Sequence, residues 1–240
     1  MSSPKDPNVR VLDISNLSFA WPDSPVLLDI PELRLNAGER LFMRGASGSG
    51  KSTLLSLIAG VLRPPEDAVR VLGKDMGAMS GAARDAFRSN HLGVVFQMFN
   101  LLPYLNVIDN VLLSCEFSQA RTRAAEREGG QRQEAERLLG RLGIKRELYK
   151  RPSNFLSVGQ QQRVAVARAL IGAPELILAD EPTSALDEEA RDAFLTLLLE
   201  ECERSGSSLI FVSHDRTLAR YFERNIDLSE INKVADEAVS

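Results

Sequence analysis

A glycine-rich stretch, GASGSGKST, runs from Gly45 to Thr53 and matches the pattern G-x-x-x-x-G-K-[ST]. Phosphate oxygens held by backbone N–H groups require a close approach and positive φ angles, which side chains obstruct and glycine permits. Lys51 is expected to reach the β- and γ-phosphates of a nucleotide, and Ser52 to ligate Mg²⁺. The residues expected to bind the nucleotide here are Gly45, Ala46, Ser47, Gly48, Ser49, Gly50, Lys51, Ser52 and Thr53.

A chance match in a flexible loop is the alternative interpretation of this stretch. The surroundings argue against it, because a short strand is predicted at 40–44, and Leu54, Leu55 and Ile58 follow the glycines at helical spacing. A helix that begins here directs its N-terminal amides and its dipole at a bound anion. The context therefore favours phosphate binding.

Two adjacent acids, Asp180 and Glu181, follow the apolar run 176–179. Ligands of parallel sheets gather at the carboxyl ends of the strands. Asp180 is therefore expected to hold Mg²⁺, directly or through water, and Glu181 to polarise a water for in-line attack on the γ-phosphorus. Acids at the end of a strand are often simply solvated. Asp180 and Glu181 therefore indicate a catalytic site only in combination with the glycine loop.

Gln97 and His214 also come directly after predicted strands. Gln97 is placed to reach the metal or the attacking water, and His214 to hydrogen-bond the γ-phosphate or that water. Taken alone, Gln97 is more simply a polar cap and His214 a structural histidine. Both become candidates for catalysis because they share the expected edge with the glycine loop.

The scaffold for these groups is predicted from the apolar pattern. Continuous apolar runs at 176–179 and 208–212 are typical of strands covered on both faces. Strands that alternate with helices predict an α/β fold with a mainly parallel sheet. Partial alternation at 9–20 and 26–35 predicts antiparallel strands before the glycine loop.

The middle of the chain, from about 106 to 150, has a helical pattern and is predicted to be inserted between strands. It includes the highly charged segment 121–139, which is broken at Gly129 and Gly130. We interpret this segment as a solvated helical face with a loop.

The composition is that of a globular protein: 240 residues, 44% hydrophobic, with a net charge of −4. That charge does not suggest binding to nucleic acid, so no nucleic-acid partner is expected. No apolar run is long enough to span a bilayer, and the N-terminus lacks the apolar segment of a secretory signal. Cys115 and Cys202 have no metal-like spacing and are expected to be buried in a reducing cytoplasm.

The stretch LSVGQQQR, from Leu156 to Arg163, resembles the signature motif of ATP-binding-cassette (ABC) ATPases. The other motifs of that family follow in the expected order, and the resemblance covers roughly residues 9–228. It implies that Gln97 is the Q-loop glutamine, which also contacts the metal, and that His214 is the switch histidine. The further nucleotide contacts that it implies are Trp21, stacked on adenine, and Ser157, Gly159, Gln160 and Asp187.

Two positions leave alternatives open. Trp21 is either the adenine-stacking aromatic or a core residue at a strand end, with Pro22 forcing an extended exit. Val158 replaces the first glycine of the usual L-S-G-G-Q signature, and valine resists positive φ. The backbone at Val158 is therefore expected either to adopt a conformation open to a β-branched residue or to be strained.

The resemblance also implies the fold and its division. The fold is that of a P-loop NTPase, a RecA-like mainly parallel sheet with an N-terminal antiparallel β subdomain and an inserted α-helical subdomain. Residues 1–240 are expected to form a single ATP-binding domain. Its parts are a catalytic core at 1–97 and 170–228, a helical subdomain with the signature at 98–169, and a C-terminal tail at 229–240.

In this family two cassettes pack head to tail, and the glycine loop of one and the signature of the other enclose each ATP. The chain is therefore expected to form a homodimer that binds and hydrolyses ATP with Mg²⁺. Closure and opening of the dimer are expected to move a separate integral-membrane permease, which would select the cargo. The expected location is cytoplasmic, peripheral on the inner face of the cell membrane, with membrane contact only through the permease.

The segment 96–113 resembles the branch that includes the macrolide-exporter, lipoprotein-release and cell-division ATPases. One alternative is an ABC ATPase without transport activity, serving DNA repair or translation, but such proteins usually carry a long coiled-coil insertion or two cassettes. Another is a different phosphoryl-transfer enzyme, such as a small-molecule kinase, which would need neither the signature nor the D-loop at 184–187.

Overall fold

The structure is a computed structural model that describes residues 9–184 and 186–234. The C-terminal tail predicted for 229–240 is thus described up to residue 234, and its last residues lie outside the described part. No helix within 9–184 or 186–234 combines the length and apolarity needed to cross a membrane.

An antiparallel sheet carries the N-terminal part of the described chain. Its strand order is β2-β1-β4-β5. The strands are β1 (Arg10–Ala20), β2 (Val26–Asn36), β4 (Val69–Val71) and β5 (Lys74–Asp75). Leu12 and Ile14 of β1 are fully buried at the spacing of two that a strand requires, and the next fully buried residue of β1 is Leu17, one position out of that period, after Asn16 with a φ of 49°. The two antiparallel strands predicted from the sequence are confirmed.

A second sheet has the strand order β6-β7-β8-β3-β9, and the strand pairs described in it are all parallel. The strands are β3 (Arg40–Arg44), β6 (Leu92–Val95), β7 (Leu176–Asp180), β8 (Ser208–Val212) and β9 (Arg224–Asp227). Every residue of β8 is buried, which explains its continuous apolar run. The prediction of a mainly parallel α/β sheet is confirmed.

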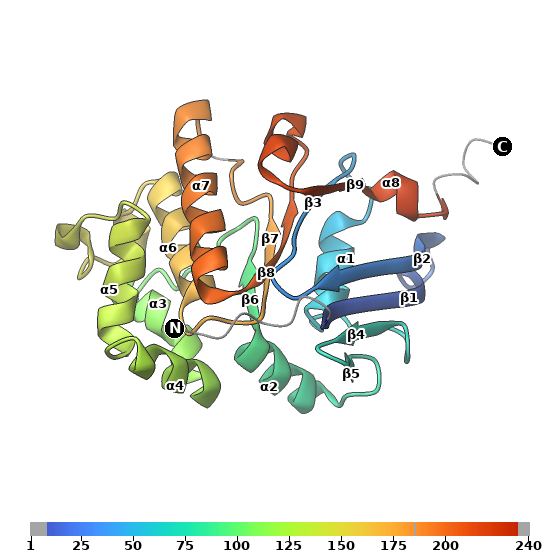
Figure 1. The fold of residues 1–240 in the computed structure, drawn as a ribbon, viewed down its shortest axis with the longest axis horizontal. Helices are drawn as coiled ribbons and strands as arrows, with labels where there is room; N and C mark the ends of the chain where they lie inside the picture. Colours follow the sequence, from blue (N-terminus) through green and yellow to red (C-terminus); the bar gives the residue numbers. More distant parts are fainter. Residues whose placement is uncertain (1–8, 185, 235–240) are drawn as a thin grey trace.

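The parallel sheet, which Figure 1 shows between the other elements, has a hydrophobic core on each face. On one face, Leu176 and Leu178 pack with the antiparallel sheet and with α1 (Lys51–Ile58). On the other face, Ile177 and Ala179 pack with the signature helix and its neighbours. The helix α1 and the signature helix α6 (Val158–Leu170) therefore lie on opposite faces of the same sheet.

Helices fill the chain between β6 and β7. They are α3 (Val107–Glu116), α4 (Gln119–Arg127), α5 (Gln131–Arg141) and α6 (Val158–Leu170), with short 3₁₀ turns at Arg146–Leu148 and Ser153–Phe155. The remaining helical elements are α2 (Gly81–His91), α7 (Glu188–Ser205), a 3₁₀ turn at Arg216–Tyr221 and α8 (Leu228–Ile231). The predicted helical insertion is confirmed, as is the break between α4 and α5, where Gly129 and Gly130 have φ angles of 103° and 114°.

The interpretation of the charged segment 121–139 as a solvated face is wrong at two positions. Arg121 is only 2% exposed and donates to the backbone carbonyls of Leu92, Ala169 and Ile171. Glu134 is 4% exposed and accepts hydrogen bonds from arginine side chains. The carbonyls that bind Arg121 and the Arg204 side chain that binds Glu134 lie outside the segment, so a local charge pattern does not reveal these contacts.

Candidate nucleotide-binding and hydrolysis site

The carboxyl ends of four parallel strands meet at one edge of the sheet. The register pairs are Met43 with Val212, Asp180 with Val212, and Val95 with Ala179. The glycine loop begins two residues after Met43, Glu181 directly follows Asp180, and His214 lies two residues after Val212. The edge thus gathers the side chains that the sequence predicts to act together.

Glycine is required within the loop before α1. Gly48 and Gly50 have φ angles of 79° and 97°, a region that side chains disfavour. A Cβ on Gly50 would also come within 2.7 Å of the Leu28 side chain. Gly50 caps the N-terminus of α1, so the first turn of that helix opens directly onto the loop.

Lys51 lies folded into the loop. Its ammonium group is 2.7 Å from the carbonyl oxygens of both Gly45 and Ala46, and the residue is 9% exposed. The hydroxyl of Ser49 is buried and has no hydrogen-bond partner within the described part of the chain. A buried cation, an unsatisfied hydroxyl and a helix N-terminus suit a multiply charged anion such as a nucleotide phosphate.

Ser52, Gln97 and Asp180 line one cavity of about 260 Å³. The Ser52 hydroxyl hydrogen-bonds Asp180, and burial nevertheless raises the pKa of Asp180 above its usual value. Hydroxyl, amide and carboxylate oxygens are the ligand types that Mg²⁺ prefers, with phosphate oxygens and water completing its shell. The residues present fit a magnesium ion bound together with a nucleotide.

Glu181 and His214 are in direct contact. The His214 Nδ1 atom lies 3.0 Å from each carboxylate oxygen of Glu181, and the His214 backbone N–H donates to Oε1 at 3.0 Å. The His214 side chain is 71% exposed and that of Glu181 12% exposed. The pair thus combines an anchored carboxylate with an imidazole that faces outward.

The signature stretch forms the N-terminus of α6. Ser157 and Gln160 make a reciprocal capping box, in which each side chain accepts from the other residue's backbone N–H at 3.3 and 3.0 Å. Val158 is the first residue of the helix and does not have a positive φ. The first of the two expectations for Val158 is therefore confirmed, and valine fits here without strain.

A comparison with known families decides the identity. The family model described as "ABC transporter" matches residues 28–184.

The chain belongs to the ABC transporter family.

Curated ABC relatives agree with this assignment. The chain is 36% identical over 224 residues to the lipoprotein-releasing system ATP-binding protein LolD of Hydrogenovibrio crunogenus, covering 92% of this chain and 94% of the relative. It is 41% identical over 230 residues to LolD of Anaeromyxobacter dehalogenans, covering 96% and 94%. The macrolide export ATP-binding/permease protein MacB of Rhodopseudomonas palustris is 39% identical over 210 residues, covering 87% of this chain and 31% of the relative. The chain spans nearly all of LolD but less than a third of MacB.

Solved ABC structures have the same fold. A dimeric structure of MJ0796, described as a bacterial ABC transporter cassette, superposes with a TM-score of 0.80 at 32% identity, covering 90% of this chain and 93% of that chain. A dimeric post-hydrolysis state of the same cassette with ADP and Pi gives a TM-score of 0.76 with the same coverage. This ABC chain is an ATP-binding and ATP-hydrolysing subunit of the LolD and MacB type.

Two further predicted site residues of this ABC cassette, Trp21 and Asp187, lie outside the strand edge described above. Trp21 is 45% exposed and meets Phe19 edge-on, with ring centroids 5.4 Å apart. Asp187 is the N-cap of α7 and accepts the Ala190 N–H at 2.9 Å. The exposure of Trp21 does not fit a core residue, and a flat exposed indole suits stacking on a base.

Ser213 is a further residue of this ABC cassette that contacts the site and that no sequence motif indicated. Its hydroxyl is buried, lies 3.3 Å from the Glu181 carboxylate and accepts the Asp215 N–H. Glu181 itself has a φ of 48°, a left-handed conformation that a non-glycine residue adopts only when its surroundings hold it. Neither feature has a signature in the sequence, apart from the position of Ser213 directly after β8.

Proposed function

We propose that the chain is the motor subunit of a membrane transporter, in which ATP-driven closing and opening of a head-to-tail homodimer moves a separate integral-membrane permease. The observation that carries this proposal is the position of α1 and α6 on opposite faces of one sheet. The signature at the N-terminus of α6 lies on the face of the sheet opposite to α1, so it is suited to contact a nucleotide that is bound by another copy of the chain. The dimeric cassettes that resemble the chain support the same arrangement.

The phosphates of ATP are held by residues 45–53. Lys51 exchanges its bonds to the Gly45 and Ala46 carbonyls for bonds to the β- and γ-phosphates. Mg²⁺, bound by Ser52, Gln97 and Asp180, would neutralise charge on the phosphate oxygens. Trp21 stacks on adenine at the outer end of the site.

Hydrolysis depends on the edge that β6, β7 and β8 share. Glu181 accepts a proton from the attacking water, and Gln97 orients that water. His214 is anchored to Glu181 through Nδ1, and its other ring nitrogen would be available to hydrogen-bond the γ-phosphate. The left-handed backbone of Glu181 keeps its carboxylate at this edge.

The partner copy completes the site. Ser157, Gly159 and Gln160 at the N-terminus of α6 offer a hydroxyl, close backbone amides and the helix dipole to the other subunit's γ-phosphate. Asp187 joins the seam beside the signature, since a Cβ on Gly159 would lie 3.0 Å from the neighbouring Leu186. ATP binding therefore favours the closed dimer, and loss of the γ-phosphate favours opening.

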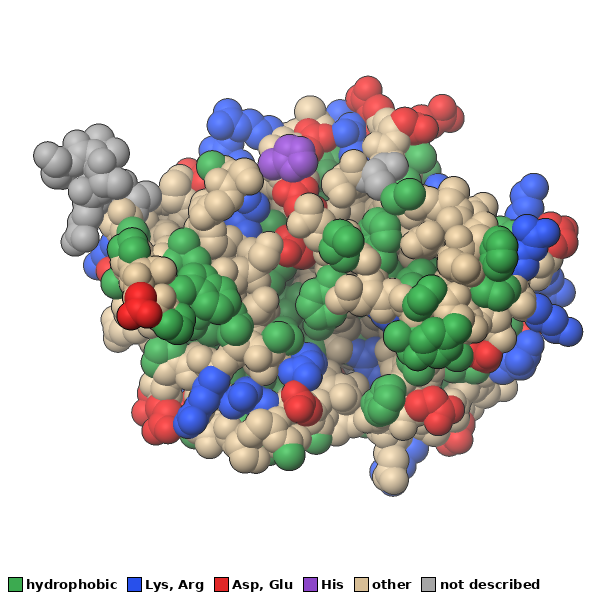
Figure 2. Space-filling view, turned by 180° about the vertical axis from the view of Figure 1, so that it is seen from behind, with side chains coloured by type: hydrophobic (Ala, Val, Ile, Leu, Met, Phe, Trp, Pro, Cys, Tyr) green, Lys and Arg blue, Asp and Glu red, His purple; other side chains and the backbone are tan. Residues whose placement is uncertain are grey.

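The permease docks on the groove between the core and the helices. A cavity of about 400 Å³ lies there, lined by residues of β6, of α3 and of the segment 96–102 that follows β6, including Leu102, Leu113 and Phe117. Phe117 is 74% exposed, and Met98 and Tyr104 nearby in the chain are 82% and 74% exposed. Figure 2 shows the molecule hollowed between the side of the antiparallel sheet and the side of the helices, with hydrophobic side chains beside the hollow. Such apolar surface suits a helix from a partner.

The division of the chain follows from these roles. Residues 98–169 form the helical subdomain that carries the signature and the groove, and residues 1–97 and 170–228 form the catalytic core. The subunit lies on the cytoplasmic face of the inner membrane and touches the membrane only through the permease. Its relation to the lipoprotein-releasing and macrolide-exporting proteins favours a partner that transmits movement across the membrane.

Isolation of the tagged protein from native membranes in mild detergents tests the transporter assignment. We expect an integral-membrane protein to co-purify with it, together with Mg²⁺-dependent ATP hydrolysis. Phe117→Asp in the groove should release that partner and leave the ATPase activity of the isolated subunit intact. Val61→Asp, at an equally apolar position that is 50% exposed outside the groove, is the control and should retain the partner. A subunit that stays alone in every detergent would support an ABC ATPase without transport activity.

A further inference from the structure

The segment 227–233 near the end of the described chain lies against the glycine loop. Strands β3 and β9 are parallel neighbours whose register ends on the pair Arg44 and Asp227, so the loop after β3 and the helix α8 after β9 leave the sheet side by side. Arg44 and Asp227 also form an ion pair, with Nε 2.9 Å from Oδ2. Leu228, the first residue of α8, is fully buried, and its Cβ lies 3.3 Å from the position of a Cβ on Gly45. The first residue of the glycine loop therefore packs on α8.

The other end of the loop packs on β2. A Cβ on Gly50 would lie 2.7 Å from the side chain of Leu28 and 3.4 Å from that of Leu27. Asn232 holds this part of β2 with both sides of its amide. Its Oδ1 accepts from the Asp29 N–H at 2.7 Å, and its Nδ2 donates to the Leu27 carbonyl at 3.0 Å. These two backbone groups flank Leu28, so Asn232 fixes the residue that backs Gly50.

A backbone hydrogen bond completes the attachment. The Lys233 N–H donates to the Asp29 carbonyl at 2.9 Å. In Figure 1, α8 continues from β9 and lies beside β2, which is an edge strand of the antiparallel sheet. The N–H and C=O groups of an edge strand need partners, and Asn232, which is only 7% exposed, supplies two of them. We call Leu228, Asn232 and Lys233 the C-terminal clamp.

We propose that Asn232 is a positioning residue for ATP, which acts through Leu28 on Gly50. A loop that moves freely before binding loses conformational entropy when its amides gather around phosphate oxygens. The C-terminal clamp fixes both ends of the glycine loop, at Gly45 and at Gly50, before ATP binds. The clamp does not touch the reacting atoms. It should therefore affect the Kd and KM for ATP and leave kcat unchanged.

Replacing Asn232 by alanine in the full chain tests this role. Asn232→Ala should raise the Kd for a fluorescent ATP analogue about fivefold and raise the KM for ATP in the same direction, with kcat at saturating ATP unchanged. Amide exchange of residues 45–51 in the nucleotide-free protein should become faster. Lys233→Pro removes only the backbone donor to Asp29 and should also raise the Kd. Asn232 has φ and ψ angles of −97° and 104°, the extended conformation that a following proline requires.

Asn110→Ala is the matched control. Asn110 is fully buried, and its amide also bonds the backbone in both directions, accepting from the Leu102 N–H at 2.8 Å and donating to the Leu105 carbonyl at 3.1 Å. These partners precede α3, in the helical part of the chain. Asn110→Ala should lower the Tm at least as much as Asn232→Ala and leave the Kd for ATP unchanged.

Three outcomes would overturn the clamp: an unchanged Kd in both Asn232→Ala and Lys233→Pro, a rise in Kd that Asn110→Ala matches, or a fall in kcat with KM unchanged. The inference rests on the proposed binding of ATP phosphates by residues 45–53, which Lys51→Ala tests separately. Normal ATP binding by Lys51→Ala would overturn that proposed function. Loss of binding in Lys51→Ala, together with a normal Kd in both clamp variants, would overturn the clamp alone.

Discussion

The ring of His214 and the carboxylate of Glu181 face each other, with Nδ1 3.0 Å from both Oε1 and Oε2. This contact sets the orientation of the imidazole, so that its Nε2 atom points away from Glu181. The carboxylate is also held by the His214 N–H and by Ser213. A change of contacts at His214 therefore acts directly on the Glu181 carboxylate, which we propose accepts a proton from the attacking water.

Replacing Glu181 by glutamine should separate ATP binding from hydrolysis. The amide keeps the shape of the side chain but is too weak a base to accept the proton, so kcat should fall by about a hundredfold or more. ATP binding should remain, and the ATP-bound dimer should accumulate. Turnover under single-turnover conditions, combined with sedimentation analysis, measures both effects. Turnover equal to that of the wild type would show that Glu181 is not the general base.

Asp180→Asn should stabilise the nucleotide-free protein near neutral pH. Burial raises the pKa of Asp180, so ionising it costs free energy in the folded state. A raised carboxyl pKa contributes stability at low pH that is lost as the pH rises through the folded-state pKa. The gain in Tm from Asp180→Asn should thus be largest at neutral pH and shrink on acidification. Thermal melts across pH without Mg²⁺ measure it.

Asp180→Asn should also lose the dependence of ATP binding on Mg²⁺, because the amide cannot offer an anionic ligand to the metal. Binding of a fluorescent ATP analogue, with and without Mg²⁺, is the second measurement. A lower Tm at neutral pH together with normal Mg²⁺ dependence would contradict the role of Asp180.

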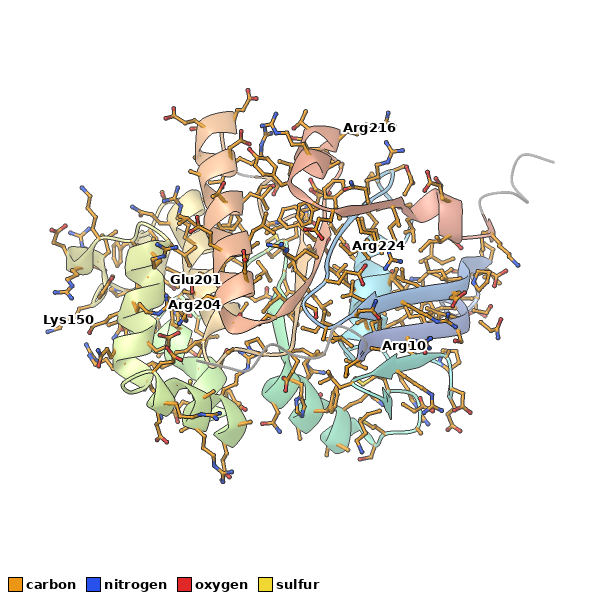
Figure 3. The ribbon with its side chains drawn as sticks, in the orientation of Figure 1. Arg10, Lys150, Glu201, Arg204, Arg216 and Arg224 are labelled. Carbon is orange, nitrogen blue, oxygen red and sulfur yellow. The ribbon has the colours of Figure 1, made fainter. Side chains whose placement is uncertain are left out.

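Glu201→Gln should destabilise the fold through an ionic network between α5 and α7 (Figure 3). The Glu201 side chain is 3% exposed and accepts from Arg137 at 2.8 and 3.0 Å and from Arg204 at 3.1 Å. Removing one charge from a buried pair costs about 3 kcal/mol. Glu200→Gln next to it is the control, since Glu200 is 50% exposed and contacts only Arg141 among the ion pairs described; it should change the free energy of unfolding by less than about 0.5 kcal/mol.

The pH dependence of this network has the opposite sign to that of Asp180. Burial alone would raise the pKa of Glu201, but the guanidinium groups of Arg137 and Arg204 outweigh it and hold that pKa below its usual value. A lowered carboxyl pKa contributes stability at neutral pH that is lost as the pH falls through the folded-state pKa. Denaturant unfolding should show the Glu201→Gln deficit shrinking in acid. A deficit independent of pH, or one shared by Glu200→Gln, would contradict the network.

The sequence was informative where chemistry depends on residues close together in the chain. The loop 45–53 is contiguous, and the apolar runs before Asp180 and His214 predict parallel strands whose carboxyl ends coincide. Together they predicted that the loop, the acids and His214 leave the same edge, and the strand registers confirm this.

Contacts between distant segments were not predictable. Nothing local distinguishes Arg121, which is buried against β6 and α6, from the exposed arginines beside it. The Arg168 side chain donates hydrogen bonds to the carbonyls of Phe99 and Asn100, which lie almost seventy positions earlier in the chain. The tail lacks a recognisable motif, yet Asn232 hydrogen-bonds the backbone of Leu27 and Asp29 in β2. Only the packed fold supplies these partners.

Ser157→Arg should abolish hydrolysis without preventing a monomer from binding ATP. Ser157 caps α6 with an exposed side chain, so an arginine there is accommodated in the isolated chain but obstructs a phosphate at the dimer seam. Lys51→Ala should abolish ATP binding by the chain that carries it, because the loop loses its buried cation. Each variant alone should be inactive, and thermal melts should show both to be folded.

Mixing these two inactive variants tests most directly whether one ATP is enclosed by two chains. A mixed dimer pairs the intact glycine loop of the Ser157→Arg chain with the intact signature of the Lys51→Ala chain. ATP hydrolysis should therefore appear in the mixture, in proportion to the mixed dimer formed. A mixture of folded chains that stays as inactive as its components would contradict a site shared between two subunits.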